Sequence, residues 1–241
     1  MEIIFNRLKN ISSSIASKAQ EYFDLNKAET FLQFLKDKNE IGGFFSKSDY
    51  PFILDRHLIE SLIHILKIND HLKLNSSTKV ADVGSGPGLP GFLFHCLVNN
   101  PELTLIDSQR RKLKHLEDFS KANKYSKLIF TYERMESVKK NFDIVTMRSS
   151  IPYPWSIEMV SGLIKKEGYF IPFLGKKEIE LERENSFLSK FGFIIEHKEE
   201  ISELEFLGKR QVKYLKKTSF PKDSLPRDWN IIQKEIRREN G

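Results

Sequence analysis

Apolar residues recur every three or four positions in two runs within the first third of the chain. The first run is Leu25, Ala28, Phe31, Leu32 and Leu35, and the second is Phe52, Leu58, Leu62, Ile65 and Leu66. This spacing is that of an α-helix with one buried face. The second helix is predicted over about residues 51–67, with Pro51 in its first turn, where the missing N–H costs little. Residues 1–75 are therefore expected to form a helical extension.

The pattern changes at Lys79 to short apolar strands that alternate with helices. Strands are predicted at residues 80–83, 103–106, 127–131, 142–146, 169–174, 191–196 and 210–216, and helices at residues 89–98, 109–123, 155–165 and 177–188. Such alternation predicts an α/β fold, with a mostly parallel seven-stranded sheet and helices on both faces. The last two strands have no helix between them and should pair antiparallel at one edge. This domain is expected to span residues 76–218, before a tail at 219–241 that ends in a short helix near residues 229–238.

The composition is that of a soluble globular protein, with 39% hydrophobic and 30% charged residues in a chain of 241. The single cysteine, Cys96, excludes an internal disulfide framework and agrees with a reducing cytosol. It lies in an apolar run, so we expect a buried side chain rather than a catalytic thiol. The sequence has no zinc-ligand spacing, no secretory signal and no apolar stretch of bilayer length. We expect a cytoplasmic monomer without a metal site or a membrane contact.

Positive charge is concentrated at the C-terminal end of the chain. The chain carries a formal net charge of +6. From Gly208 onward, ten basic residues oppose four acidic residues, so this segment carries +6 and residues 1–207 are neutral overall. The basic residues are Lys209, Arg210, Lys213, Lys216, Lys217, Lys222, Arg227, Lys234, Arg237 and Arg238. A localised basic end is typical of contact with a polyanion, and equally of a solvated tail.

The strongest local signal is a glycine-rich loop directly after the first predicted strand. Gly84, Gly86 and Gly88 alternate along it, and Leu89 begins an apolar segment. Glycines let the backbone turn sharply and let a ligand approach main-chain atoms. Asp107 follows 23 residues after Gly84, at the end of the next predicted strand. An acidic side chain there can accept hydrogen bonds from both hydroxyls of an adenosine ribose.

Two classes of cofactor fit such a loop. Residues 86–91 match the glycine spacing of a dinucleotide fingerprint, but Pro87 and Pro90 interrupt the helix start that would face the phosphates. The register Gly84-x-Gly86-x-Gly88 suits S-adenosylmethionine, which has no pyrophosphate. We therefore favour a methyltransferase over a nicotinamide or flavin enzyme. In this fold the loop after the third strand lies beside the adenine, where Met135 and Glu136 are candidate contacts.

These pieces together resemble the glucose-inhibited division protein B family, the small-subunit rRNA methyltransferase G enzymes. The resemblance covers about residues 54–175. It rests on residues 54–62, which are similar to the Arg-His-x-x-Asp-Ser-Leu helix of the family, and on residues 82–91, which match its cofactor loop almost letter for letter. Residues 106–116 resemble its second strand and helix, residues 134–136 its Arg-Val-Glu and residues 142–149 its Phe-Asp-x-x-x-Ser-Arg-Ala.

The resemblance implies a Rossmann-like class I fold and methyl transfer from S-adenosylmethionine to N7 of guanine 527 of 16S rRNA, as naked RNA or in the assembled subunit. It implies cofactor contacts at Gly84, Leu89, Met135, Glu136 and Arg148, the last on the rim where substrate meets the methyl group. Because N7 has a lone pair and no proton, no general base is needed, and positioning and electrostatics should carry catalysis.

Candidates for RNA contact are Arg110, Arg111, Lys112 and Lys114, together with Lys209 and Arg210 of the basic end. Tyr153 and Trp155 fit either stacking on the guanine or ordinary packing. The sequence departs from the family pattern at residues 43–45, which replace Asn-Leu-Thr, at Glu60, which replaces aspartate, and at Lys176, which is displaced from the family lysine. Because these departures lie on the substrate side, two alternatives stay open. One is a methyltransferase of a small molecule or a protein, and the other is a non-catalytic cofactor-binding or RNA-binding module.

Overall fold

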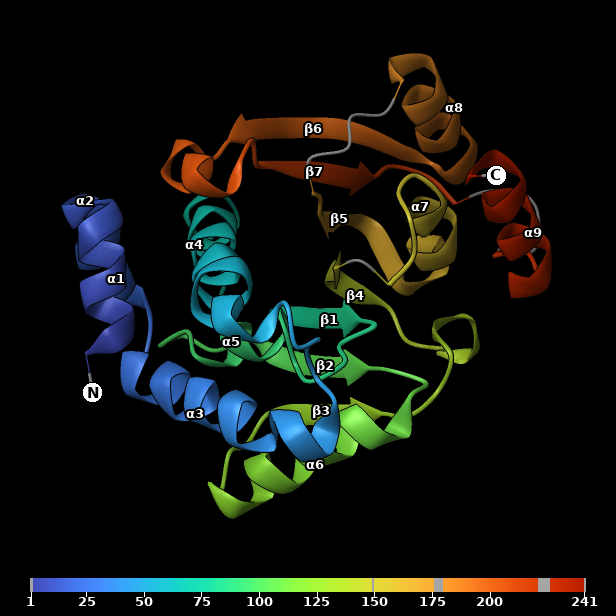
Figure 1. The fold of residues 1–241 in the computed structure, drawn as a ribbon. Coiled ribbons are helices and arrows are strands. Elements are labelled where there is room, and N and C mark those ends of the chain that lie inside the picture. The colour runs from blue at the N-terminus through green and yellow to red at the C-terminus, as the bar shows by residue number, and fades with distance from the viewer. Residues whose placement is uncertain (1, 149, 176–179, 221–225, 241) are drawn as a thin grey trace.

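The computed structural model describes residues 2–148, 150–175, 180–220 and 226–240 (Figure 1). Lys176 and the start of the helix predicted at 177–188 lie outside these ranges. Within them, no helix is both long and apolar enough to cross a membrane.

The N-terminal third is helical, as its apolar spacing predicts. It contains α1 (Ile3–Ile11), α2 (Ser13–Tyr22), α3 (Leu25–Gly42) and α4 (Glu60–Leu72). The helix predicted over residues 51–67 is interrupted in its first half. A 3₁₀ turn (Tyr50–Phe52) and a π-helix (Ile53–Ile59) precede α4 there. A π-helix is wider than an α-helix and often marks a functional site.

Seven strands form one sheet in the order β3-β2-β1-β4-β5-β7-β6. They are β1 (Lys79–Val83), β2 (Glu102–Ile106), β3 (Leu128–Thr131), β4 (Phe142–Arg148), β5 (Ile164–Phe173), β6 (Phe193–Glu200) and β7 (Gln211–Lys217). The first five strands are parallel, and β7 pairs antiparallel with both β5 and β6. The predicted antiparallel pair is therefore confirmed, with the short 3₁₀ segment Ser202–Leu207 between its strands.

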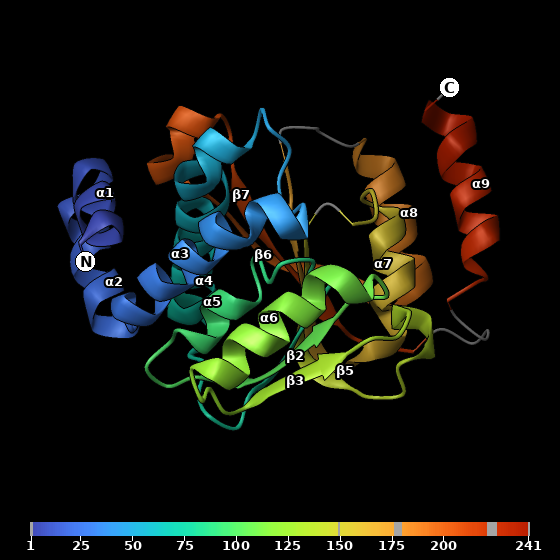
Figure 2. The ribbon, with the colours of Figure 1, turned by 60° about the horizontal axis from the view of Figure 1, so that its bottom comes forward.

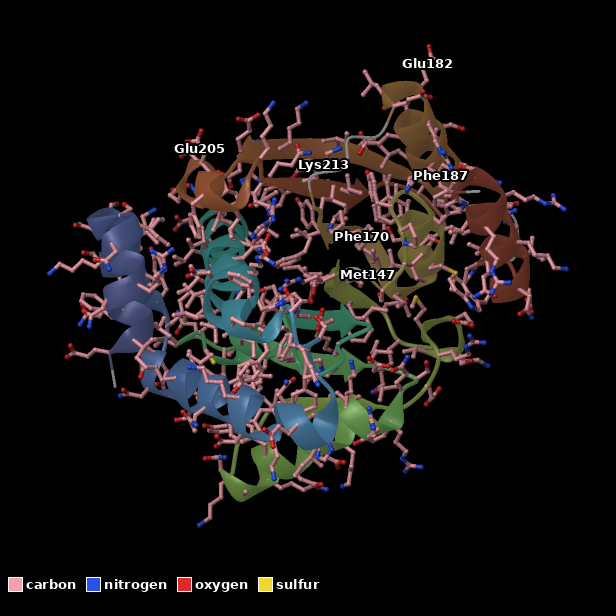
Figure 3. All side chains as sticks on the ribbon, viewed as in Figure 1. Met147, Phe170, Glu182, Phe187, Glu205 and Lys213 are labelled. Carbon is pink, nitrogen blue, oxygen red and sulfur yellow. The ribbon has the colours of Figure 1, made fainter. Side chains whose placement is uncertain are left out.

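Helices cover both faces of the sheet, which confirms the predicted fold class (Figure 2). The helices of the first half, with α5 (Phe92–His95) and α6 (Arg110–Ala122), bury one face around Val80, Leu103 and Tyr214. The helices α7 (Trp155–Val160), α8 (Leu181–Phe191) and α9 (Trp229–Asn240) bury the other face. Met147 and Phe170 lie inside this second layer, whereas Glu182 and Glu205 point outward (Figure 3).

Several predicted elements have different limits in the structure. The helix predicted at 89–98 is reduced to Phe92–His95, because Leu97 leaves it to form a β-bridge with Phe23. The helix predicted at 155–165 ends at Val160, and β5 already begins at Ile164 opposite Phe142. The strand predicted from residue 191 begins at Phe193, because α8 runs on to Phe191 and ends at Gly192, whose φ is 72°.

Candidate cofactor cleft

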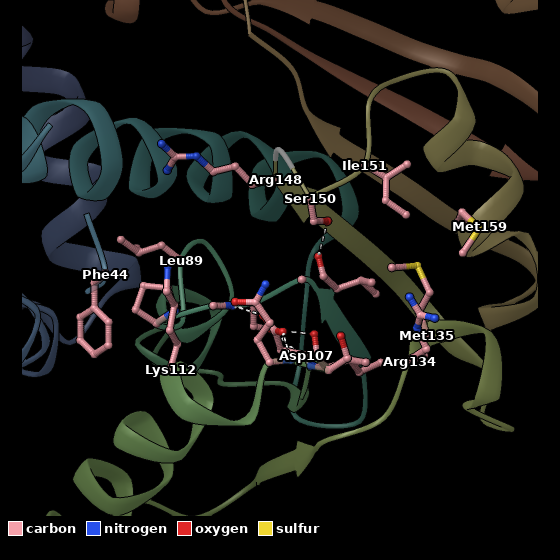
Figure 4. Close-up of a pocket in the computed structure, with 18 of the residues that line it drawn as sticks. Phe44, Leu89, Asp107, Lys112, Arg134, Met135, Arg148, Ser150, Ile151 and Met159 are labelled. Atoms are coloured by element: carbon pink, nitrogen blue, oxygen red, sulfur yellow. Dashed lines mark hydrogen bonds between the residues drawn. The ribbon is translucent and has the colours of Figure 1, made fainter. Parts of the chain in front are cut away.

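A cleft of about 770 Å³ opens where the parallel strands β1, β2 and β4 end (Figure 4). This is where open α/β sheets bind their ligands, because the loops after neighbouring parallel strands meet there. Seven of the eight predicted cofactor residues line it: Gly84, Gly86, Leu89, Asp107, Met135, Glu136 and Arg148. The eighth, Gly88, lies behind the loop.

The glycine loop folds tightly because three of its residues adopt positive φ. The φ angles are 71° at Gly84, 52° at Gly86 and 106° at Gly88. A Cβ at Gly86 would meet no protein atom within 4 Å, so the cleft is open beside its Cα. A Cβ at Gly88 would come within 2.5 Å of Leu116 Cδ2. Gly86 thus leaves room for a ligand, and Gly88 lets α6 pack close behind the loop.

Asp107 stands at the end of β2, facing the glycine loop. Its Oδ2 accepts a hydrogen bond from the backbone N–H of Gly86 at 2.7 Å, and its Oδ1 accepts one from that of Gln109 at 2.7 Å. These bonds fix the carboxylate at the lip of the cleft (Figure 4). A carboxylate has further lone pairs for two ribose hydroxyls.

Asp82, within β1, supports the loop from below. The carboxylate is fully buried and accepts hydrogen bonds from the Thr146 hydroxyl and the Gly91 backbone N–H, each at 3.1 Å. Burial raises the pKa of Asp82 to about 7, although these hydrogen bonds act in the opposite direction. Asp82 therefore joins β1 to β4 and to the far end of the glycine loop.

One end of the cleft is apolar. Met135 and Glu136 belong to a 3₁₀ turn, Met135–Ser137, which packs against α7. Ile151 and Met159 line the cleft beside Met135 (Figure 4). Thioether and aliphatic side chains suit the faces of a purine ring. Glu136 also lines the cleft, and its carboxylate can accept hydrogen bonds.

Arg148 ends β4 and turns towards the π-helix. It donates hydrogen bonds to the carbonyl oxygens of Arg56 and His57 at 2.8 and 3.3 Å, and to Ser61 Oγ at 3.2 Å. Its Nη2 also lies 2.6 Å from His57 Nδ1. Burial lowers the pKa of Arg148, and nearby carboxylates, Glu60 first, counteract this. Arg148 therefore anchors the π-helix to the sheet at the edge of the cleft.

His57 links Arg148 to Asp49, and all three residues line the cleft. Because arginine only donates, His57 Nδ1 accepts from Arg148, and His57 Nε2–H donates to Asp49 Oδ2 at 2.7 Å. Burial, and then the charge of Arg148, lower the pKa of His57. The geometry therefore favours a neutral imidazole that carries its proton on Nε2.

The family departure at Glu60 has a structural counterpart. Glu60 Oε2 lies 3.6 Å from Arg148 Nη2, and Glu60 Oε1 accepts a hydrogen bond from Arg210 Nε. The side chains of Glu60 and Arg210 are both only 12% exposed. A carboxylate here balances two buried cations, so Arg210, a predicted RNA contact, also holds β7 against α4.

The other predicted RNA contacts lie in two places. Arg110 and Arg111 are exposed at the start of α6, where Arg110 lies 5.1 Å from the ring centre of Tyr132. Lys112, the next residue, lines the cleft. Lys209 is exposed before β7. Arg110, Arg111 and Lys112 therefore form a basic margin on the α6 side of the cleft.

Half of the ten cations at the basic end have partners within the protein. Besides Arg210, these are Lys213 with Glu184, Lys216 with Glu196, Lys217 with the Phe191 carbonyl, and Arg227 with Glu158. Lys209, Lys234, Arg237 and Arg238 are exposed, and Lys222 lies outside the described residues. The charge excess counted from the sequence therefore overstates the positive surface of this segment.

Three further side chains named from the sequence pack against other parts of the protein; Trp155 and Cys96 are buried and Tyr153 is half-buried. Trp155 is 5% exposed, and the Tyr153 hydroxyl donates to the buried Glu184 carboxylate. Both aromatic residues therefore pack. Cys96 is fully buried, and burial raises the pKa of its thiol. This confirms the prediction of a packing cysteine.

Several lining residues were not among the predicted site residues. Phe44, Phe45 and Asp49 come from the segment before the π-helix, and Trp229 comes from the start of α9. The only signal for Phe44 and Phe45 was their place in the departure from the family pattern. Trp229 carried no signal, because its approach to the cleft depends on the tertiary fold.

The model of the family described as GidB, rRNA small subunit methyltransferase G, matches residues 24–205. The chain belongs to this family. The family and its enzyme class, a methyltransferase, are those expected from the sequence motifs, which confirms both predictions. The matched range includes most of the cleft but ends before β7 and α9.

Two relatives, both named "Ribosomal RNA small subunit methyltransferase G", match all 241 residues. The protein from Leptospira interrogans is 44% identical and the one from Leptospira borgpetersenii 45%, and in each case 100% of this chain and 95% of the relative are covered. A relative of the same name from onion yellows phytoplasma is 29% identical, over 66% of this chain and 75% of the relative.

Solved structures with the same fold have diverged widely in sequence. Magnesium protoporphyrin IX methyltransferase from Synechocystis, solved with bound S-adenosylmethionine, has a TM-score of 0.50 and 14% identity, over 76% of this chain and 97% of that chain. The [4+2]-cyclase SpnF has a TM-score of 0.51 and 15% identity, over 67% and 81%. The second structure shows that this fold alone does not fix the reaction.

Proposed function

We propose that this protein transfers the methyl group of S-adenosylmethionine to N7 of a guanine in 16S rRNA. The observation that carries the proposal is the convergence of Gly86, Asp107 and Met135 in one cleft, within a chain of the rRNA small subunit methyltransferase G family. The names of the Leptospira relatives support RNA of the small subunit as the substrate.

The residues of the cleft fit S-adenosylmethionine. The open space beside Gly86 admits a ligand against the backbone, the carboxylate of Asp107 suits a ribose, and the apolar walls at Met135 and Met159 suit an adenine. When bound, this cofactor supplies an electrophilic methyl group on a positively charged sulfur. The glycine loop and Asp107 would hold and orient it within the cleft.

The arrangement around His57 suits an acceptor that needs no deprotonation. The lone pair of guanine N7 forms the new bond to carbon, the sulfur–methyl bond breaks, and the positive charge passes to the base. His57 Nδ1 is occupied by Arg148, and its Nε2 proton is held by Asp49. Neither nitrogen of His57 is therefore free to take a proton from the substrate. We assign His57, Arg148 and Asp49 to positioning the π-helix, and catalysis comes from orientation of the reacting groups.

The test is transfer of labelled methyl groups to small ribosomal subunits, and to 16S rRNA, from cells that lack this modification. The modified nucleotide is then mapped. We expect label on guanine N7, and loss of labelling in Asp107→Ala. Cofactor binding without label on either RNA would leave a methyltransferase of a small molecule or a protein, or a non-catalytic module. Label on another nucleotide would refute the proposed site of methylation.

A further inference from the structure

The start of α9 forms part of the wall of the cofactor cleft. Trp229 is half-buried and lines the cleft together with Ile151, Met135 and Met159. Trp229 and Met135 pack against the same apolar core between the sheet and α7. The C-terminal segment thus reaches a site that is otherwise built by residues 44–159.

Arg227, two residues before Trp229, fixes this segment to α7. Its Nε and Nη2 donate to the two carboxylate oxygens of Glu158 at 2.8 and 2.7 Å, and its backbone N–H donates to Glu158 Oε1 at 3.1 Å. The Glu158 side chain is 0% exposed. A buried carboxylate is strongly destabilising without a partner, so this contact is specific and firmly held.

The helix α9 runs beside α7 and α8 (Figure 2), and further side-chain contacts hold it there. Glu235 accepts two hydrogen bonds from Arg227, at 2.6 and 3.0 Å, and Glu239 pairs with Arg183 of α8. Ile232 is fully buried in the core beneath α7. The position of Trp229 is therefore determined on both sides, by the anchor at Arg227 and by the packing of α9.

Trp229 lies with the adenine-side residues of the cleft. The turn that carries Met135 packs against α7, the helix to which Arg227 is anchored. Arg148, which marks the acceptor side, lies on the opposite side of Ser150 from Ile151 and Met159 (Figure 4). An aromatic ring among Met135, Ile151 and Met159 is placed to cover a purine rather than to meet the acceptor base.

We propose that Trp229 is a cofactor-binding residue that packs on the adenine of S-adenosylmethionine, and that Arg227 positions it through Glu158. This proposal rests on the use of S-adenosylmethionine proposed above. It assigns part of the cofactor site to a segment beyond residue 205, where the match to the family model ends. The segment lies within the full-length match to both Leptospira relatives.

The test compares the affinity of Trp229→Ala and wild type for S-adenosylmethionine and for S-adenosylhomocysteine by isothermal titration calorimetry. Loss of a base-stacking aromatic costs about 1–3 kcal/mol, so we expect both dissociation constants to rise by about 5-fold to about 140-fold. Both should rise by the same factor, because the two ligands share the adenine. Trp229→Phe should recover most of the affinity.

Matched variants separate this role from a general loss of structure. Ile231, on the exposed side of α9, provides the control Ile231→Ala, which should bind both ligands like wild type. Arg227→Ala should weaken both ligands as Trp229→Ala does, and the double variant should be little weaker than either single one. Circular dichroism and the unfolding midpoint check that each variant is folded.

The outcomes distinguish this inference from the proposed function. If wild type binds neither ligand, the proposed cofactor is wrong. If wild type binds both, and folded Trp229→Ala binds them equally well, the role of Trp229 is refuted. Unchanged binding with a raised KM for RNA would place Trp229 at the acceptor instead. Quenching of Trp229 fluorescence by S-adenosylhomocysteine in Trp155→Phe, which removes the other tryptophan, would support direct contact with the adenine.

Discussion

Asp82 should make the stability of this protein fall as the pH rises from acid to neutral. The side chain is fully buried within β1, and desolvation raises its pKa from 3.8 to about 7. A folded-state pKa above the unfolded value means that the contribution to stability is fully present below pH 3.8 and is lost as the pH rises through 7. The variant Asp82→Asn removes the ionisation and keeps the shape. Its amide oxygen can accept from Gly91 N–H, while its NH₂ group faces Thr146 Oγ1.

The size of the effect follows from the two pKa values. The difference between 3.8 and about 7, at about 1.4 kcal/mol per pH unit, gives a full cost of about 4 kcal/mol for the ionised carboxylate. Over the practical range from pH 5 to pH 8, about 2–3 kcal/mol of this cost develops. We therefore compare the free energies of unfolding of Asp82→Asn and wild type. The variant's value minus that of wild type should rise by about 2–3 kcal/mol between about pH 5 and pH 8.

Urea unfolding at several pH values, followed by circular dichroism, measures this difference. His64 and His95 act in the opposite direction, because burial lowers the pKa of each to about 4 and their contribution is lost as the pH falls. Both histidines are present in wild type and variant, so the difference isolates Asp82. The control Asp118→Asn removes an exposed carboxylate from α6. A difference between Asp82→Asn and wild type that does not change with pH would refute the argument from burial.

Three further predictions concern the cleft. Asp107→Ala loses two charge-assisted ribose hydrogen bonds of about 1.5–3 kcal/mol each. Calorimetry should therefore find that the variant binds S-adenosylmethionine at least about a hundredfold more weakly than wild type. Unchanged affinity would exclude Asp107 as the ribose ligand. Gly88→Ala forces a Cβ against Leu116 at a φ of 106°, and urea unfolding should show a loss of about 1–3 kcal/mol. Arg148→Ala leaves Glu60 with one cation fewer at the π-helix, and its melting temperature and methyl transfer should both fall. A fully active Arg148→Ala would show that the clamp on the π-helix is dispensable.

The meeting of the glycine loop and Asp107 in one cleft could be predicted because its signals are local. Each glycine of the loop is needed for the backbone of a single turn, and Asp107 directly follows a strand whose apolar run is plain in the sequence. A strand, a loop and a second strand in parallel register bring these residues together without help from distant segments. The family motifs placed Met135 and Glu136 in the same way.

The Arg148 side of the cleft depends on contacts between distant residues. Arg148 meets His57 across 91 positions, and the sequence gives no sign that a π-helix would present His57 towards it. Arg210 was named for its charge, but a neighbour on another element, Glu60, determines where its guanidinium points. Side chains of this kind are placed by packing and charge pairing, which periodicity and composition do not describe.

The residues that line the cleft lie far apart along the chain and are therefore synthesised at different times. The lining begins at Phe44 and is completed by Trp229, 185 residues further along the chain. A nascent chain therefore holds the glycine loop and Asp107 long before the last wall of the cleft has been translated. Because contacts between distant residues form late in folding, the wall that Trp229 contributes should be among the last parts of the cleft to form.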